Sequence, residues 1–197
     1  RHKAPPRPPP APGVPGSSPA VVRFAFAHLL SRVQLVGRID PSSAGIVGFT
    51  PRVHAIRLYG VPRTGSLSVA ADAVTDPAAL LAAWSLSGTT TSEAPMAEFT
   101  SPAGAEISTD GVLLLDALPL PQQLTPDASV EVVYSTDGTG TELKTTVSQL
   151  TALSVSTWEA GRQYRYTFNI SDRDRILFDT PTVNGWDEAV GGITIVD

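Results

Sequence analysis

The stretch "WEAGRQYRYTFNIS", residues 158–171, carries the clearest pattern in the chain. From residue 164 to residue 170, the even-numbered positions are apolar or aromatic and the residues between them are polar; the apolar set is Tyr164, Tyr166, Phe168 and Ile170. An alternation of period two is typical of a strand with one buried and one solvated face. We therefore predict a strand over residues 162–170 whose apolar side faces a second sheet.

Short apolar segments recur along the rest of the chain, separated by Gly, Pro, Asp and Asn clusters. They predict further strands at residues 53–59, 67–71, 112–115, 130–134, 143–147, 153–156, 176–178 and 193–196. The segment "YSTDGTGTEL", residues 134–143, predicts a hairpin around an Asp-Gly turn. One segment, "DPAALLAAW", departs from this pattern: Asp76 as N-cap and Pro77 at the first helical position predict a helix of two turns.

The region from Val21 to Val36 has two interpretations. Alternating apolar residues at 22–26 and again at 33–36 favour two strands joined by one helical turn at residues 28–31. A single helix is the alternative, because Phe26, Leu29, Leu30 and Val33 would share one helical face. With many short strands and one incidental helix, the chain is predicted to be all-β, an antiparallel sandwich or barrel.

Composition excludes several classes of partner. The 197 residues suit one domain, there is no cysteine for a disulfide or thiolate site, and the net charge is −5. An acidic chain has no overall attraction to nucleic acid or anionic lipid, and no run reaches the roughly 18 apolar residues of a membrane helix. Residues 1–20 are rich in proline and predict a linker or disordered tail ahead of one domain over residues 21–197.

The sequence contains no recognisable combination of catalytic or metal-binding residues. The histidines, His2, His28 and His54, have no partner at ligand spacing, and no nucleophile, base and orienting group can be combined. We therefore expect no enzyme, no metal and no cofactor. Three tryptophans offer a different possibility, a stacking platform for a sugar, although a Trp beside alternating apolar residues is usually core; they are Trp84, Trp158 and Trp186.

Several motifs, in order, resemble a known family. "FAFAHLLSRVQL", "LPLPQQL", "VEVVY", "WEAGRQYRYTFNIS", "RILFDTPTV" and "GWDEAVGGITIV" are similar to the C-terminal domain of the fimbrillin family, subunits of surface fimbriae in Bacteroidales bacteria. The resemblance spans residues 21–196. It implies a transthyretin-like, Greek-key β-sandwich, lipoprotein export to the outer membrane and cell surface, and assembly with other fimbrial subunits by exchange of β-strands.

Two departures from the family shape the functional expectation. Full-length members carry another domain ahead of the Phe-x-His segment, and here a proline-rich run precedes it, so the chain is expected to be a fragment or a reduced form. It also ends after "GGITIVD" without a long alternating tail, which favours a tip, accessory or minor subunit. Ile193, Thr194, Ile195 and Val196 are the candidate exchanged strand. The alternative is a monomeric surface module that binds glycans or host proteins.

Overall fold

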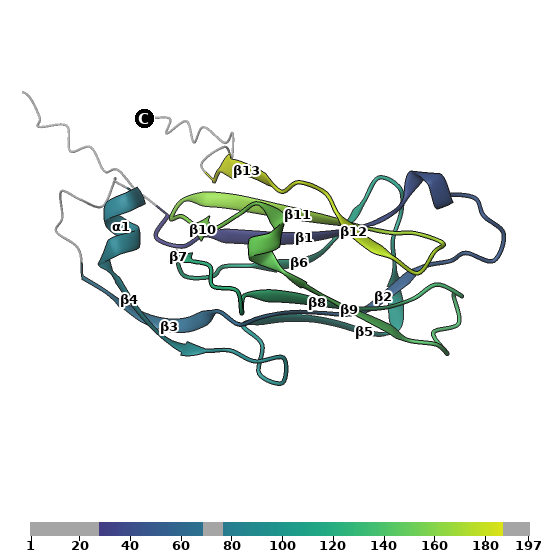
Figure 1. The fold of residues 1–197 in the computed structure, drawn as a ribbon, viewed down its shortest axis with the longest axis horizontal. Coiled ribbons are helices and arrows are strands. Elements are labelled where there is room, and N and C mark those ends of the chain that lie inside the picture. Colours follow the sequence, from purple (N-terminus) through teal and green to yellow (C-terminus); the bar gives the residue numbers. More distant parts are fainter. Residues whose placement is uncertain (1–27, 69–76, 187–197) are drawn as a thin grey trace, which may run out of the picture.

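The structure, a computed structural model, describes residues 28–68 and 77–186. Its two large sheets lie face to face, as Figure 1 shows. The first sheet has the strand order β12-β11-β1-β6, with β13 also pairing with β11. Its strands are β1 (Arg32–Ile39), β6 (Val112–Ala117), β11 (Arg162–Ile170), β12 (Ile176–Phe178) and β13 (Thr182–Gly185).

The second sheet has the order β5-β2-β8-β9 and is antiparallel throughout. Its strands are β2 (Arg52–Tyr59), β5 (Ala97–Glu106), β8 (Ser129–Ser135) and β9 (Lys144–Gln149). Two smaller sheets pair β3 (Pro62–Leu67) with β4 (Trp84–Thr89), and β7 (Gln122–Gln123) with β10 (Thr157–Trp158). The described helices are α1 (Pro77–Ala83) and the 3-10 turns η1 (Pro41–Ser43) and η3 (Leu150–Leu153).

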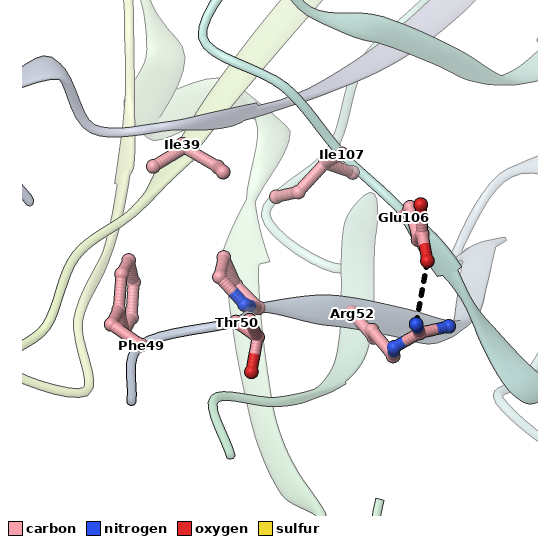
Figure 2. Close-up of a pocket in the computed structure, with 7 residues that line it drawn as sticks. Ile39, Phe49, Thr50, Arg52, Glu106 and Ile107 are labelled. Atoms are coloured by element: carbon pink, nitrogen blue, oxygen red, sulfur yellow. Dashed lines mark hydrogen bonds and ion pairs between the residues drawn. The ribbon is translucent and has the colours of Figure 1, made fainter. Parts of the chain in front are cut away.

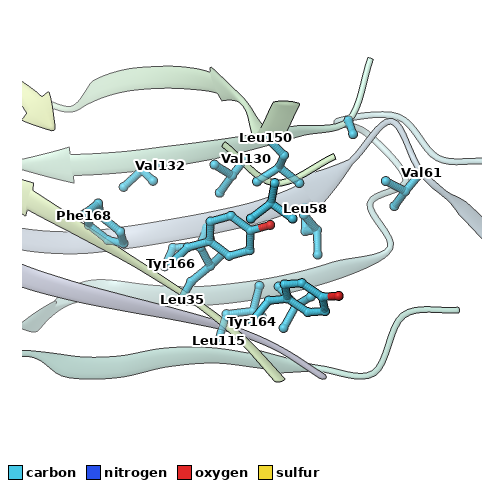
Figure 3. Packing of buried hydrophobic residues seen from close by; sticks show 14 of the residues in the cluster. Leu35, Leu58, Val61, Leu115, Val130, Val132, Leu150, Tyr164, Tyr166 and Phe168 are labelled. Carbon is cyan, nitrogen blue, oxygen red and sulfur yellow. The ribbon is translucent and has the colours of Figure 1, made fainter. Parts of the chain in front are cut away.

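The core lies between the two large sheets. Tyr166 and Phe168 of β11 are fully buried, as the alternation predicts, and Leu35 of β1 is buried beside them. They face the buried residues of the second sheet, among them Leu58 and Val130 (Figure 3). Each large apolar side chain contributes about 1.5–3 kcal/mol by leaving water. The prediction of an all-β sandwich with short helices is confirmed, and the barrel alternative is wrong.

One strand pair differs from the antiparallel expectation. β1 and β11 run parallel, with Arg32 opposite Gln163 and Ile39 opposite Ile170. Gly37 of β1 is closely surrounded: an added Cβ would lie 2.9 Å from Leu114 Cδ1 and 3.0 Å from Phe168 Cζ, so these side chains would have to shift. The glycine therefore lets β11 bring its aromatic ring against β1.

Some local predictions need correction. Residues 28–31 form no helical turn, and Ser31 instead donates backbone and hydroxyl hydrogen bonds to the carbonyl oxygens of Pro119 and Glu159. The predicted strand at 153–156 is wrong: η3 places Leu150 in the core, and Ser154 follows with a φ of 66°. Of the predicted strand 67–71, Leu67 ends β3, and residues from 69 lie outside the described part.

The remaining predicted elements are either confirmed or lie outside the residues that the structure describes. The strands β2, β6, β8, β9, β11 and β12, the β8–β9 hairpin and the helix after residue 76 are confirmed. The sequence does not predict β3, β4 and β13, because most of their residues are exposed. It does not predict β5 either, because Pro102 and Gly104 interrupt the alternation that begins at Ala97. The predicted linker 1–20, the predicted strand 22–26 and the candidate exchanged strand 193–196 lie outside the described residues.

Candidate functional site: an apolar sheet edge

A sheet edge with apolar side chains lies along β6. This strand pairs with β1 on one side, and its other side pairs with no strand among the described residues. Its sequence is "VLLLDA"; Leu115 and Ala117 are buried in the core, whereas Leu113 remains 48% exposed. Leu118, just after the strand, is 51% exposed. β6 therefore presents free backbone groups beside exposed apolar surface, which is what an added strand requires.

The other edges of the two large sheets carry features that oppose pairing. β5 contains Pro102, which has no N–H, and Gly104 with a φ of 74°. β9 begins with Lys144, whose ammonium group lies 2.5 Å from the Asp174 carboxylate. β12 and β13 are three and four residues long. Proline, lysine, short strands and β-bulges are the usual protections of exposed edges. β6 lacks the first three, although its register with β1 is irregular at Leu114, between the pairs Leu35–Leu115 and Val36–Leu113.

The charged residue of β6 is held against the sheet. Asp116 receives hydrogen bonds from Arg32 Nε at 2.9 Å and from Gln34 Nε2 at 3.1 Å. The Arg32 guanidinium also forms an ion pair with Asp116 at 2.5 Å. The Arg32 hydrogen bond lowers the pKa of Asp116 despite partial burial of the carboxyl group, and Gln34 adds to this effect. The acidic side chain is thus directed to the outer face of the first sheet, away from the free edge.

An apolar pocket of about 240 Å³ opens at one end of the sandwich (Figure 2). Ile39 from the end of β1 and Ile107 from the loop before β6 lie above Phe49, and Arg52 and Glu106 form an ion pair of 2.6 Å at the side. The adjoining loop exposes Val47 almost completely, at 99%. The pocket therefore has an apolar lining and a charged rim.

In the described part of the chain, no cluster of three or more His, Asp or Glu residues could hold a metal ion.

The three tryptophans lie on different elements. Trp158 on β10 is fully buried and donates a hydrogen bond to the Tyr166 hydroxyl. Trp84 begins β4, after α1, and its ring nitrogen is buried without a hydrogen-bond partner. Trp186 follows β13 and stacks on His28, with ring centroids 4.0 Å apart. Trp158 is therefore part of the core and offers no free face to a ligand.

The described part of the chain contains no helix that is long and apolar enough to cross a membrane. The sequence alone did not reveal the β6 edge, because "VLLLDA" reads equally well as an interior strand. Recognition of an edge needs the sheet order, which a local pattern does not contain.

Three solved structures from Bacteroides are similar to this chain. A candidate cell adhesion protein of Bacteroides ovatus is 15% identical, with a TM-score of 0.42 over 80% of this chain and 45% of its own. One of Bacteroides uniformis is 15% identical, with a TM-score of 0.47 over 84% and 54%. A fimbrial protein of Bacteroides vulgatus is 14% identical, with a TM-score of 0.46 over 82% and 55%. The chain spans about half the length of these structures.

Among curated proteins, none matches the chain. A family model described as fimbrillin-like, in contrast, matches residues 11–186, which include all of the described strands. That match covers most of the sequence and includes the motifs quoted above up to "RILFDTPTV", residues 175–183. The chain therefore belongs to the fimbrillin-like family.

Proposed function

We propose that this protein is a structural and adhesive subunit of a cell-surface fimbria and has no enzymatic activity. Family membership supports this role, and the edge of β6, which pairs with no further strand among the described residues, is the observation that carries it. An extended strand from a neighbouring subunit would add to β6, with backbone hydrogen bonds providing affinity and Leu113 contributing apolar contact. Head-to-tail contacts of this kind build a filament when the rotation between neighbouring subunits does not close a ring.

The finer parts of the proposal concern place and partners. We propose a tip, accessory or minor position, export as an outer-membrane lipoprotein, and other fimbrial subunits as the partners. Residues 193–196 remain the proposed donor strand, since "ITIV" alternates Ile and Thr in the manner of an edge strand. Residues 1–20 are proposed to serve as a linker to the domain of residues 21–197.

The test compares two substitutions on opposite borders of the first sheet. Leu113→Glu places a charge at the proposed acceptor edge, whereas Val183→Glu places the same charge on β13, where Val183 is 46% exposed. Immunogold labelling of cells that express each full-length variant would measure incorporation into fimbriae, and circular dichroism of the purified proteins would check folding. We expect Leu113→Glu alone to abolish incorporation. Wild-type protein that never appears in fimbriae would refute the proposal.

A second candidate function is a monomeric module that binds glycans or host proteins. The tryptophan platform gives this second function little support, because Trp158 is buried in the core and has no face free for a sugar. A recess on the second sheet, with an aromatic wall and unpaired polar groups, favours it independently. Adhesion and assembly are compatible in one subunit, since the recess and β6 belong to different sheets.

A further inference from the structure

A recess of about 440 Å³ lies where the second sheet meets the Pro62–Thr89 end of the paired strands β3 and β4. Three of its lining residues form one row across the sheet: Tyr59 of β2 is opposite Ser129 of β8, which is opposite Gln149 of β9. The facing wall is formed by Thr89, the last residue of β4, and by Ser92 in the loop that follows. Asp127, in the turn before β8, completes the border.

The aromatic wall follows from strand alternation. Leu58 points into the core, so Tyr59 points to the outer face, where it is half-buried. Its neighbour across the strand pair, Ser129, is small, and the Ser129 hydroxyl donates a hydrogen bond of 2.9 Å to the backbone carbonyl of Asp127. The Tyr59 ring therefore has a small side chain beside it across the strand pair, and both residues line the recess.

The polar groups around the ring are available for a ligand. Among the described residues, the Asp127 carboxylate, the Gln149 amide and the Ser92 hydroxyl form no hydrogen bond or ion pair within the chain. Asp127 and Gln149 are exposed, so water satisfies them in the unbound protein. Carboxylate and amide groups that converge beside an apolar surface are the usual means of fixing a small polar ligand.

The facing wall is held in place by buried contacts. Thr90, which is 6% exposed, donates backbone and hydroxyl hydrogen bonds of 3.1 and 2.9 Å to the Val61 carbonyl oxygen. The Gly60 N–H donates to the Thr90 carbonyl oxygen at 3.0 Å. Because both sides of the recess are anchored, binding would lose little free energy in ordering the loop.

The charge around the recess selects among ligand classes. Asp127 is the charged residue of its lining. The adjoining hollow contains Arg57, which is paired with Glu98 at 2.7 Å and Glu131 at 2.5 Å. That cation is already neutralised, and an anionic ligand would meet uncompensated carboxylate charge. A ligand with many hydroxyl groups and an apolar C–H face satisfies the acceptors and the ring together.

We propose that this recess binds a neutral saccharide, with one sugar ring against Tyr59 and its hydroxyl groups bonded to Asp127 and Gln149. The inference rests on the adhesive part of the proposed function. It assigns recognition to a sheet face, whereas assembly is assigned to the β6 edge.

Binding of the purified full chain to immobilised oligosaccharides tests the assignment. The probes are glycans ending in neutral hexoses or N-acetylhexosamines, with sialylated glycans for comparison. We expect wild-type protein to bind at least one neutral glycan, Tyr59→Ala to weaken it at least tenfold, and Gln149→Ala to weaken it several-fold. Tyr59→Phe should retain binding, because the ring is kept. Val147→Ser, on the same face and outside the recess, is the matched control.

Three outcomes would overturn the inference: no binding of wild type to any neutral glycan, binding of sialylated glycans alone, or equal binding by wild type and Tyr59→Ala. Circular dichroism and urea unfolding of each variant would show that it is folded. Fimbrial incorporation of Tyr59→Ala separates the two proposals. Normal incorporation without glycan binding by the wild type would refute the saccharide site alone, whereas failed incorporation of the wild type would refute the fimbrial role.

Discussion

The indole nitrogen of Trp158 donates a hydrogen bond of 3.0 Å to the hydroxyl oxygen of Tyr166, and both side chains are fully buried. This bond connects β10 to β11 across eight residues of sequence. Burial raises the pKa of Tyr166 far above its ordinary value, so its hydroxyl stays protonated. The two aromatic side chains therefore form a polar contact inside an apolar core.

Tyr166→Phe should destabilise the protein by about 1–3 kcal/mol, because it leaves the Trp158 N–H buried without an acceptor. The free energy of unfolding in urea measures this loss. Tyr59→Phe is the matched control, since the Tyr59 hydroxyl has no hydrogen bond within the described chain, and its effect should be within about 0.5 kcal/mol. Equal stabilities of the two variants would contradict the role assigned to the buried pair.

Two glycines with similar backbone angles should respond very differently to alanine. Gly60 has a φ of 75° and Gly45 a φ of 80°, so both substitutions incur the left-handed backbone penalty of roughly 1–2 kcal/mol. At Gly60 the new Cβ would also lie 1.8 Å from the Asp127 carbonyl oxygen, whereas at Gly45 it meets nothing within 4 Å. Thermal unfolding should show the larger loss for Gly60→Ala, above about 3 kcal/mol.

The ion pair of Asp116 should make stability depend on pH. Because folding lowers the pKa of this carboxyl group, its contribution is fully present above about pH 4 and is lost as the pH falls through the lower folded pKa. Asp116→Asn cannot titrate, so its stability should decline less than that of the wild type over this acidic range. Urea unfolding at several pH values below 5 measures the difference, and parallel curves would exclude the effect.

Core packing predicts a strong contrast between two aliphatic residues. Leu35 is completely buried between the sheets, and Leu35→Ala should cost about 2–5 kcal/mol through lost burial and the cavity left behind. Val47 is 99% exposed, so Val47→Ala should change stability by less than about 0.5 kcal/mol. Chemical denaturation measures both, and a small effect at Leu35 would contradict the position of the core.

The accuracy of the sequence predictions follows the burial of each element. β11 and β12 begin and end at the predicted residues, because β11 alternates buried aromatic residues with polar ones and β12 follows a clear turn. β5 is not predicted from the sequence, since Pro102 and Gly104 interrupt its ten residues. Its strand conformation is imposed by pairing with β2, and such long-range pairing leaves no local pattern.

The candidate sites were harder to predict for a related reason. The β6 edge exists because no described strand lies beyond it, and the saccharide recess exists because Tyr59, Ser129 and Gln149 share one row. These residues are separated by up to 90 positions, from residue 59 to residue 149. Their proximity is a property of strand register, which composition and motif spacing do not encode.

The parallel pairing of β1 and β11 has a mechanical consequence. The eight paired positions from Arg32–Gln163 to Ile39–Ile170 join an early strand to a late one in the same direction. A pull that separates the start of β1 from the end of β11 loads this ladder along its length, so its hydrogen bonds must fail together instead of opening one by one. A subunit of this design would resist tension along a fibre through shear strength, and its lifetime under load would be set by the rate of that concerted rupture.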